Sequence, residues 1–353
     1  MTTTTTSTEP DTGPRAATGK GSLLAAELGR LRRRRLVATL LLLGFAGLLV
    51  AMAVVFGTHS TDLAGARAEA ARSAQEQAAA SREFEAACRQ DPSIPEAEKE
   101  TACNPGGAPT AEDFFQDPRF LAERGLPEVA IGVAVVGALV TALVGATAVG
   151  ADWSSRAVIT LLTWEPRRLR LLGTRLVAVA LVCAAAGVVA QLVALGLGAL
   201  TAELRGTWTG SANHPEEGLG LVPHAHFWRD LLSLQLRGVV LMVLAGVLAA
   251  CVTSVTRHTG GLLGLLFAWF AVAENAVRVL GSDRGWPRWL LTENILAFLL
   301  PGGRLMATGT GFTTEGRDAG SVLVSNLDAL LYLGAVTAAA AVLAGVLLRR
   351  RDL

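Results

Sequence analysis

The sequence predicts an all-α integral membrane protein with six transmembrane helices. Of its 353 residues, 51% are hydrophobic and only 17% are charged, which is too apolar for a soluble domain of this size. Six apolar runs reach about the 20 residues that a helix needs to cross a bilayer. These runs are continuous and do not alternate in polarity, which excludes a transmembrane β-barrel.

The apolar runs divide the chain into membrane spans and aqueous segments. Turn residues or charges interrupt each pair of consecutive runs, as at Thr256 to Gly260 between the fourth and the fifth. We expect the spans at residues 36–56, 128–149, 176–200, 236–256, 261–280 and 328–348. The connecting segments are then 57–127, 150–175, 201–235 and 281–327, and residues 349–353 form a short tail.

Arginines mark one side of the membrane. They gather before the first span, between the second and third, after the fourth and after the sixth, and six spans place these four segments on the same side. Because cytoplasmic segments carry an excess of arginine and lysine, both termini are expected in the cytoplasm, and 57–127, 201–235 and 281–327 outside. The arginines are Arg30, Arg32 to Arg35, Arg156, Arg167, Arg168, Arg170, Arg175, Arg257 and Arg349 to Arg351.

Arginine replaces lysine almost everywhere, since Lys20 and Lys99 are the only lysines of the chain. Together with the abundance of alanine, glycine and valine, this usage is typical of a GC-rich bacterial genome. The membrane is therefore expected to be a bacterial plasma membrane.

The chain begins with a polar tail and an amphipathic segment. Residues 1–21 are of low complexity and predict a disordered cytoplasmic tail. In residues 22–35, Leu24, Leu28 and Leu31 recur at helical spacing before a run of arginines, which predicts an interfacial helix with its leucines in the lipid. The alternative is a plain cytoplasmic extension of the first span. That span is expected to be a retained anchor, because it starts late and lacks a cleavage site.

The large external segment 57–127 combines a helix, a loop and two cysteines. Residues 62–89 are rich in alanine, glutamate, glutamine and arginine, and predict a helix that extends the first span outward. The stretch PSIPEAEKETACNPGGAP that follows predicts a loop. Cys88 and Cys103 lie outside the spans on the oxidising side, so we expect a disulfide that contributes about 3 kcal/mol. Cys183 and Cys251 lie within spans and are expected to be packing residues.

Residues 150–175 are too patterned for a simple connecting loop. Asp152 or Ser154 can cap a short helix, and Pro166 ends it. Burying its arginines in hydrocarbon would cost about 2.5 to 3.5 kcal/mol each, so the segment lies at the cytoplasmic surface. Such a helix anchors to lipid or docks on a partner, and the charged turn at 164–168 favours docking. Its apolar face consists of Val158, Leu161 and Leu162.

Three stretches resemble one family of transporters. GADWSSRAVITLLTWEPRRLRLLGTRLVAVALV resembles the segment after the second span of permease subunits of the ABC-2 type, where a coupling helix meets the nucleotide-binding subunit. SLLAAELGRLRRRR resembles their interfacial helix, and LLRRRDL is similar to their C-terminus. The chain departs from the pattern at Arg156-Ala157, where such proteins often have Gly-Thr.

The resemblance implies a permease subunit of a two-component ABC exporter. Its pathway would be formed as a dimer, either with a second copy or with a related permease subunit, in contact with membrane lipid and not with nucleic acid. Two copies of a separate ATPase subunit would bind the ATP and Mg and dock on the coupling helix. The residues that this coupling would use are Trp153, Arg156, Val158, Leu161, Leu162, Thr163, Trp164, Glu165, Pro166, Arg167 and Arg168.

No ATP-hydrolysing or other catalytic motif is found in the chain. The nearest imitation of a Walker A loop, at residues 18–21, has the wrong glycine spacing and no hydroxyl after the lysine. We therefore expect no catalytic or cofactor-binding residue. A membrane-embedded sensor or enzyme that is not coupled to an ATPase is the alternative, but G-x-S-G, H-E-x-x-H and paired mid-span aspartates are missing. Nor does a filter-like segment indicate a passive channel.

Weaker candidates for chemistry lie in the external loops and inside the spans. His214, His224 and His226, with carboxylates nearby, could bind zinc, but irregular loops often collect such residues, and no metal site is expected. Gln191 predicts an interhelical hydrogen bond. Glu274 and Arg278 stand four residues apart beside Asn275, and can form a structural pair or contact a substrate.

The segment 281–327 contains apolar runs that are too short to cross the membrane. Glu293 and Asn294 interrupt these runs, and residues 301–303 (Pro-Gly-Gly) close them. This length predicts re-entrant or interfacial helices. Trp286 and Trp289 suit the interface between membrane and water.

Overall fold

The computed structural model describes residues 20–103, 109–154, 168–208, 226–281, 286–307 and 321–350. Within these ranges, six helical segments are long and apolar enough to cross a membrane, which confirms the number predicted from the sequence. The fifth of them consists of three consecutive helical pieces. The segments are α2 (Arg35–Thr58), α6 (Ala122–Ser154), α8 (Arg168–Arg205), α9 (Phe227–Thr256), then α10 (Thr259–Phe267), η1 (Ala268–Ala273) and α11 (Glu274–Gly281), and finally α13 (Asn326–Arg350).

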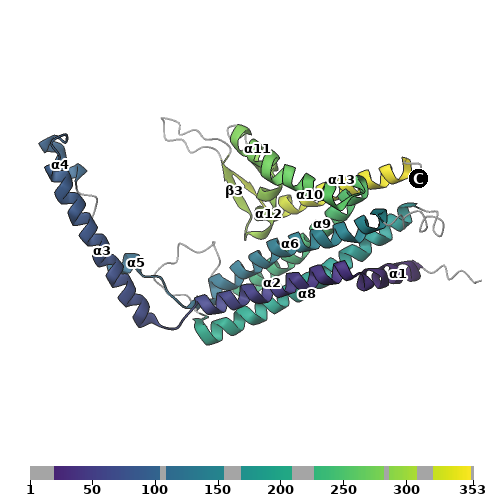
Figure 1. The fold of residues 1–353 in the computed structure, drawn as a ribbon, viewed down its shortest axis with the longest axis horizontal. Helices are drawn as coiled ribbons and strands as arrows, with labels where there is room; N and C mark the ends of the chain where they lie inside the picture. The colour runs from purple at the N-terminus through teal and green to yellow at the C-terminus, as the bar shows by residue number, and fades with distance from the viewer. Residues whose placement is uncertain are drawn as a thin grey trace, which may run out of the picture.

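The long helices α2, α6, α8 and α9 run side by side and form the main part of a bundle (Figure 1). At one end of this bundle, the α1 end, lie α1 (Lys20–Arg33) and the end of α13. At the other end, the α3 end, the chain projects away in α3 (Leu63–Gln90). The even number of spans brings both ends of the described chain to the α1 end. The arginine pattern predicts that this end is cytoplasmic.

Helices α6 and α9 make the closest contact of the bundle, through small residues. A Cβ atom placed on Gly145 would overlap the carbonyl oxygen of Gly246, and a Cβ on Gly246 would contact the sulfur of Cys183. Beside this contact the hydroxyl of Thr141 donates to the carbonyl oxygen of Met242 at 2.8 Å. Small residues that let two backbones approach, together with interhelical hydrogen bonds, are the usual means by which membrane helices associate.

A tight turn returns the chain from α9 to α10. Arg257 has a left-handed φ of 59°, which ends α9. The Nδ1 atom of His258 then accepts a hydrogen bond from the backbone N–H of Gly260 at 3.0 Å and caps α10. In η1 the helix widens to a π-helix, which leaves carbonyls without their usual partners. Asn275 supplies a donor there, because its Nδ2 bonds the carbonyls of Phe270 and Ala271 at 3.2 and 3.0 Å.

The segment after α2 forms a separate arm. The sequence predicts that it extends the first span outward, but α3 does not continue α2. The chain bends between His59 and Asp62, and the Asp62 carboxylate caps α3 by accepting from the Gly65 N–H at 2.8 Å. With 28 residues, α3 is about 42 Å long. The short helix α5 (Ala111–Phe114) packs along it. The sequence PSIPEAEKETACNPGGAP is not all loop, because it contains α4 (Glu96–Ala102).

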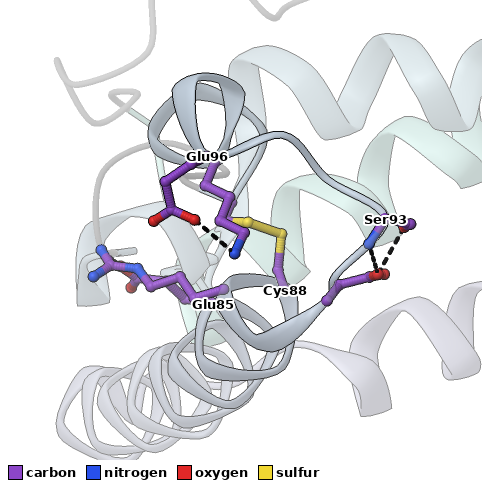
Figure 2. Close-up of a disulfide and its surroundings, with 8 residues drawn as sticks. Glu85, Cys88, Ser93 and Glu96 are labelled. Atoms are coloured by element: carbon purple, nitrogen blue, oxygen red, sulfur yellow. Dashed lines mark hydrogen bonds and ion pairs between the residues drawn. A yellow bond between two sulfur atoms is a disulfide. The ribbon is translucent and has the colours of Figure 1, made fainter.

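The predicted disulfide between Cys88 and Cys103 is confirmed (Figure 2). It joins the last turn of α3 to the end of α4, with the two Cα atoms 5.5 Å apart. Asp91 stabilises the turn between these helices by accepting from the N–H and the hydroxyl of Ser93 at 2.8 and 2.6 Å. These two hydrogen bonds lower the pKa of the Asp91 carboxyl. The far tip of the arm is therefore closed covalently.

Beyond α11 the chain forms two short helices and a pair of antiparallel strands, and the sequence did not predict the strands. The helices are the 3₁₀-helix η3 (Trp286–Trp289) and α12 (Leu291–Leu299). The strands β3 (Arg304–Ala307) and β4 (Ser321–Val324) pair antiparallel. At the α3 end a second small pair, also not predicted, joins the start of α6 to the end of α8, because β1 (Phe120–Leu121) runs parallel to β2 (Gly206–Thr207).

The close approach of α6 and α9 generates a prediction about stability. The substitution Gly145→Ala forces these two backbones apart, and we expect it to lower the free energy of unfolding by about 1–3 kcal/mol. Gly196→Ala is the matched control, because a Cβ there meets open space. Since alanine is the better helix former, this substitution should raise the free energy of unfolding by about 0.5–1 kcal/mol. Thermal unfolding of the detergent-solubilised variants measures the difference. Equal melting temperatures would show that this contact does not hold the bundle together.

Candidate functional site

The leucines of α1 pack on the protein. The prediction that they lie in the lipid is wrong for Leu31, which is only 3% exposed. Leu24 and Leu28 are partly buried and pack against the same cluster. They contact small residues of three spans, so α1 is a packed part of the bundle. The residues of this cluster are Ala148, Val149, Ala178, Val179, Cys183 and Ala250.

A buried charge cluster fixes α1 to α8. The Glu27 carboxylate, with Glu27 only 5% exposed, receives Arg30 of its own helix at 2.6 Å and the Nε of Arg175 at 3.5 Å. Arg175 is 7% exposed and belongs to the second turn of α8. A buried carboxylate needs such partners, because removing a charge from water without compensation costs several kcal/mol.

The residue between α1 and α2 fixes the same end to α6. The Nη1 atom of Arg34 donates to the carbonyl oxygens of Ala148 and Thr147, at 2.7 and 3.2 Å. These carbonyls lie near the end of α6, which stops at Ser154. Helix α1 and its linker therefore hold both helices that flank residues 155–167. We call Glu27, Arg30, Arg34 and Arg175 the α1-end charge cluster.

Most of the predicted coupling residues lie outside the described part of the chain. Trp153 lies in the last turn of α6 and Arg168 in the first turn of α8. The α1-end charge cluster contacts α6 at Thr147 and Ala148 and α8 at Arg175, in the same two helices. The residues outside the described ranges are Arg156, Val158, Leu161, Leu162, Thr163, Trp164, Glu165, Pro166 and Arg167.

A second charge cluster joins the end of the fifth span to α12. Arg278 lies 3.9 Å from Glu274, the pair that the sequence predicts, but it binds Glu293 more closely, at 2.6 Å. Arg304 of β3 binds the other oxygen of Glu293 at 3.2 Å. Glu274 and Glu293 are 3% and 6% exposed, and Glu274 also accepts from the Thr292 N–H at 3.1 Å. The cluster is therefore a structural joint between α11, α12 and β3.

Two donors that the sequence analysis did not single out satisfy the end of α12. Asn326 Nδ2 donates to the carbonyls of Ala297 and Leu300, both at 2.7 Å. Arg237, inside α9, donates to the carbonyls of Phe298 and Leu300 at 3.2 Å. The last carbonyls of a helix have no partner within it. An arginine within an apolar span was the available signal, since such a residue requires a partner.

Among the other predicted sites, Gln191 forms the expected interhelical contact. Its Nε2 donates to the carbonyl of Ala130 in α6 at 3.1 Å, and the backbone carbonyl of Gln191 faces Nε2 of Gln235 at 3.5 Å. Of the histidines considered for zinc, His226 directly precedes α9, whereas His214 and His224 lie outside the described residues. Within the described ranges, no three histidine, cysteine or acidic side chains are grouped closely enough to hold a metal ion.

Comparison with known proteins assigns the chain to no family. No protein-family model matches the sequence, and no curated protein matches it significantly.

The α1-end charge cluster predicts how α1 responds to the loss of its arginine partner. Arg175→Met leaves the buried Glu27 with less compensation, and we expect α1 to dock less tightly by about 1–3 kcal/mol. Leu31→Cys is added to the unmodified chain and to each variant. Because Leu31 is buried, the rate at which maleimide labels this cysteine measures how often α1 opens. We expect faster labelling with Arg175→Met, and recovery in the double variant Glu27→Gln, Arg175→Met. Unchanged labelling would mean that packing alone holds α1.

The joint at Glu293 predicts a local loss of stability. Glu293→Gln removes the charge that binds both Arg278 and Arg304, and we expect the unfolding free energy to fall by about 1–3 kcal/mol. Glu85→Gln is the control, because it breaks the exposed pair with Arg89, which is worth about 0.3–0.5 kcal/mol. Hydrogen exchange of residues 286–307 measures the effect. Equal protection in both variants would contradict the structural role of the joint.

Proposed function

We propose that the chain is the permease subunit of a two-component ABC exporter. In this proposal, it forms the translocation pathway as a dimer, and a separate ATP-hydrolysing subunit docks on residues 150–170. ATP and Mg bind to that partner. The chain itself supplies the spans, the docking surface and the mechanical connection between them.

One observation carries the proposal: the α1-end charge cluster connects both helices that flank the docking segment. Glu27 binds Arg175 at the start of α8, and Arg34 binds carbonyls near the end of α6. A partner that moves residues 155–167 therefore acts on two spans that are already joined. A passive surface loop requires no such connection between its two ends.

The packing of the spans supports a route for this movement. Helix α6 meets α9 through Gly145 and Gly246, where the contact leaves no room for an added carbon. Tightly packed interiors transmit displacement, because their interfaces shift as units. A push on α6 would consequently move α9, and through the hydrogen bonds from Arg237 it would reach α12.

The fifth span supports the dimer. Large apolar side chains of α10, η1 and α11 are exposed in a single copy of the chain. Within the described residues, this span packs on α9 and α6 mainly through α10. We propose that a second permease subunit covers part of this face. The exposed side chains are Leu263, Leu265, Phe267, Trp269, Val272, Val279 and Leu280.

The proposal predicts a specific effect of two substitutions in the docking segment. The full chain is reconstituted with an ABC ATPase from the same genome, and ATP hydrolysis is measured with and without the chain. Leu162→Ala with Trp164→Ala should abolish co-purification and lower the stimulation of ATP hydrolysis at least about tenfold, the equivalent of ~1.4 kcal/mol, because the apolar contact is lost. The isolated ATPase keeps its basal rate.

Trp228→Ala is the matched control, since Trp228 is an exposed tryptophan in the first turn of α9, beside Trp208, which directly follows β2. It should leave both association and stimulation unchanged. If the docking variant still binds and stimulates the ATPase, the assignment of the docking segment fails. If no ATPase associates with the unmodified chain, the alternative of a membrane-embedded sensor or enzyme takes its place.

A further inference from the structure

A deep groove of about 1010 Å³ lies between α2, α6 and α8. Its volume reaches the upper end of the range that is usual for small-molecule pockets. The groove extends from α2 inward to the helices packed beside it, because its wall includes Ala185 and Ala186 of α8 and Met242 of α9. A molecule in it would therefore contact α2, α6, α8 and α9 at once, and would differ from lipid that only covers the outer surface of the bundle.

Along the spans the wall of the groove is apolar, and glycines widen it. The lining from Leu41 to Met52 contains only apolar side chains and glycines. At Gly47 of α2 and Gly132 of α6, an added Cβ would meet no atom within 4 Å. These two glycines therefore do not serve close helix packing, in contrast to Gly145. They leave space that a ligand can fill.

At the α3 end the groove has a polar mouth, formed by His59, Asp117, Arg119, Arg124 and Glu128. Asp117 binds Arg119 at 2.6 Å, and Glu128 binds the Nε of Arg124 at 3.0 Å. The side-chain hydrogen bond from Arg119 lowers the pKa of the Asp117 carboxyl. The mouth thus offers two guanidinium groups and two carboxylates side by side.

The pattern of the groove specifies a class of ligand. An apolar channel along the spans with a charged opening at their ends fits an amphiphile, whose chains lie in the channel and whose head lies at the mouth. A guanidinium binds phosphate through several N–H donors, and Arg124 uses only its Nε for Glu128 within the described residues. A purely anionic head would face Asp117 and Glu128, whereas a head with an added ammonium group matches both signs.

We propose that this groove is a binding site for a zwitterionic phospholipid. Its acyl chains lie between α2 and α6, its phosphate binds Arg119 and Arg124, and its ammonium group faces Asp117 and Glu128. The site does not depend on the ABC exporter assignment, because it uses none of the residues at the α1 end. A failure of either proposal leaves the other intact.

The test uses the full chain, purified in maltoside micelles with a trace of phosphatidylethanolamine that carries a photoreactive diazirine in one acyl chain. After irradiation, mass spectrometry maps the cross-linked peptides. We expect cross-links in residues 41–52 and 129–140. Unlabelled phosphatidylethanolamine and phosphatidylcholine should compete about tenfold better than phosphatidylglycerol or diacylglycerol. Equal competition by all four lipids, or cross-links spread over the whole apolar surface, would overturn the proposal.

Filling the groove supplies the second arm. Gly132→Leu and Gly47→Leu place a side chain in the open space on α6 and α2, and each should lower cross-linking about tenfold. Gly196→Leu is the matched control, because Gly196 of α8 also has open space but does not line the groove. Unchanged cross-linking in the two groove variants would contradict the site. The competition on the unmodified chain decides the question if a variant fails to fold.

A third arm tests the mouth. Arg124→Gln with Glu128→Gln removes one pair of charges and should reduce the advantage of the two zwitterionic lipids over diacylglycerol about tenfold. Arg89→Gln with Glu85→Gln, an exposed pair on α3, should leave that advantage unchanged. If both double variants keep the full discrimination, the headgroup is not bound by the charged mouth.

Discussion

The structure depends on one constraint of the bilayer: a polar group in an apolar environment must find its partner within the protein. The helices widen or end at places where a side chain can donate a hydrogen bond to the backbone carbonyls that are left without a partner. Asn275 bonds the carbonyls freed by the π-helix, and Asn326 and Arg237 bond those at the end of α12. Such donors allow a span to widen or a short helix to end beside the bundle without exposing bare backbone to lipid.

The same constraint explains what the sequence could predict. Hydropathy is a local property, so the six spans were recognisable one by one, and two cysteines outside the spans were enough to predict the disulfide at the tip of the arm. Helix ends were less predictable, because a helix continues past its apolar run when its polar residues find partners. Helix α8 starts at Arg168, well before the expected residue 176, and Arg175 is buried against Glu27 in that extension.

The partners of most contacts between helices could not be predicted. The spacing of Leu24, Leu28 and Leu31 correctly indicated a helical face, but periodicity does not distinguish a face on lipid from a face on protein. Only the neighbouring cluster of small residues decides this. Likewise, Glu274 and Arg278 were visible as a pair four residues apart, whereas Glu293, which binds Arg278 more closely, belongs to another helix.

The two ends of the bundle are built on opposite principles. At the α1 end, buried charges and closely packed small residues tie α1, α6 and α8 together, so that movement of one requires movement of the others. Towards the α3 end, Gly47 and Gly132 line a groove between α2, α6 and α8, and an added Cβ at either glycine would meet no atom within 4 Å. In the exporter that we propose, the packed α1 end would be the region that receives force from the partner. Glycine serves both regions, since Gly145 permits the contact of α6 with α9, whereas Gly132 leaves open space in the groove.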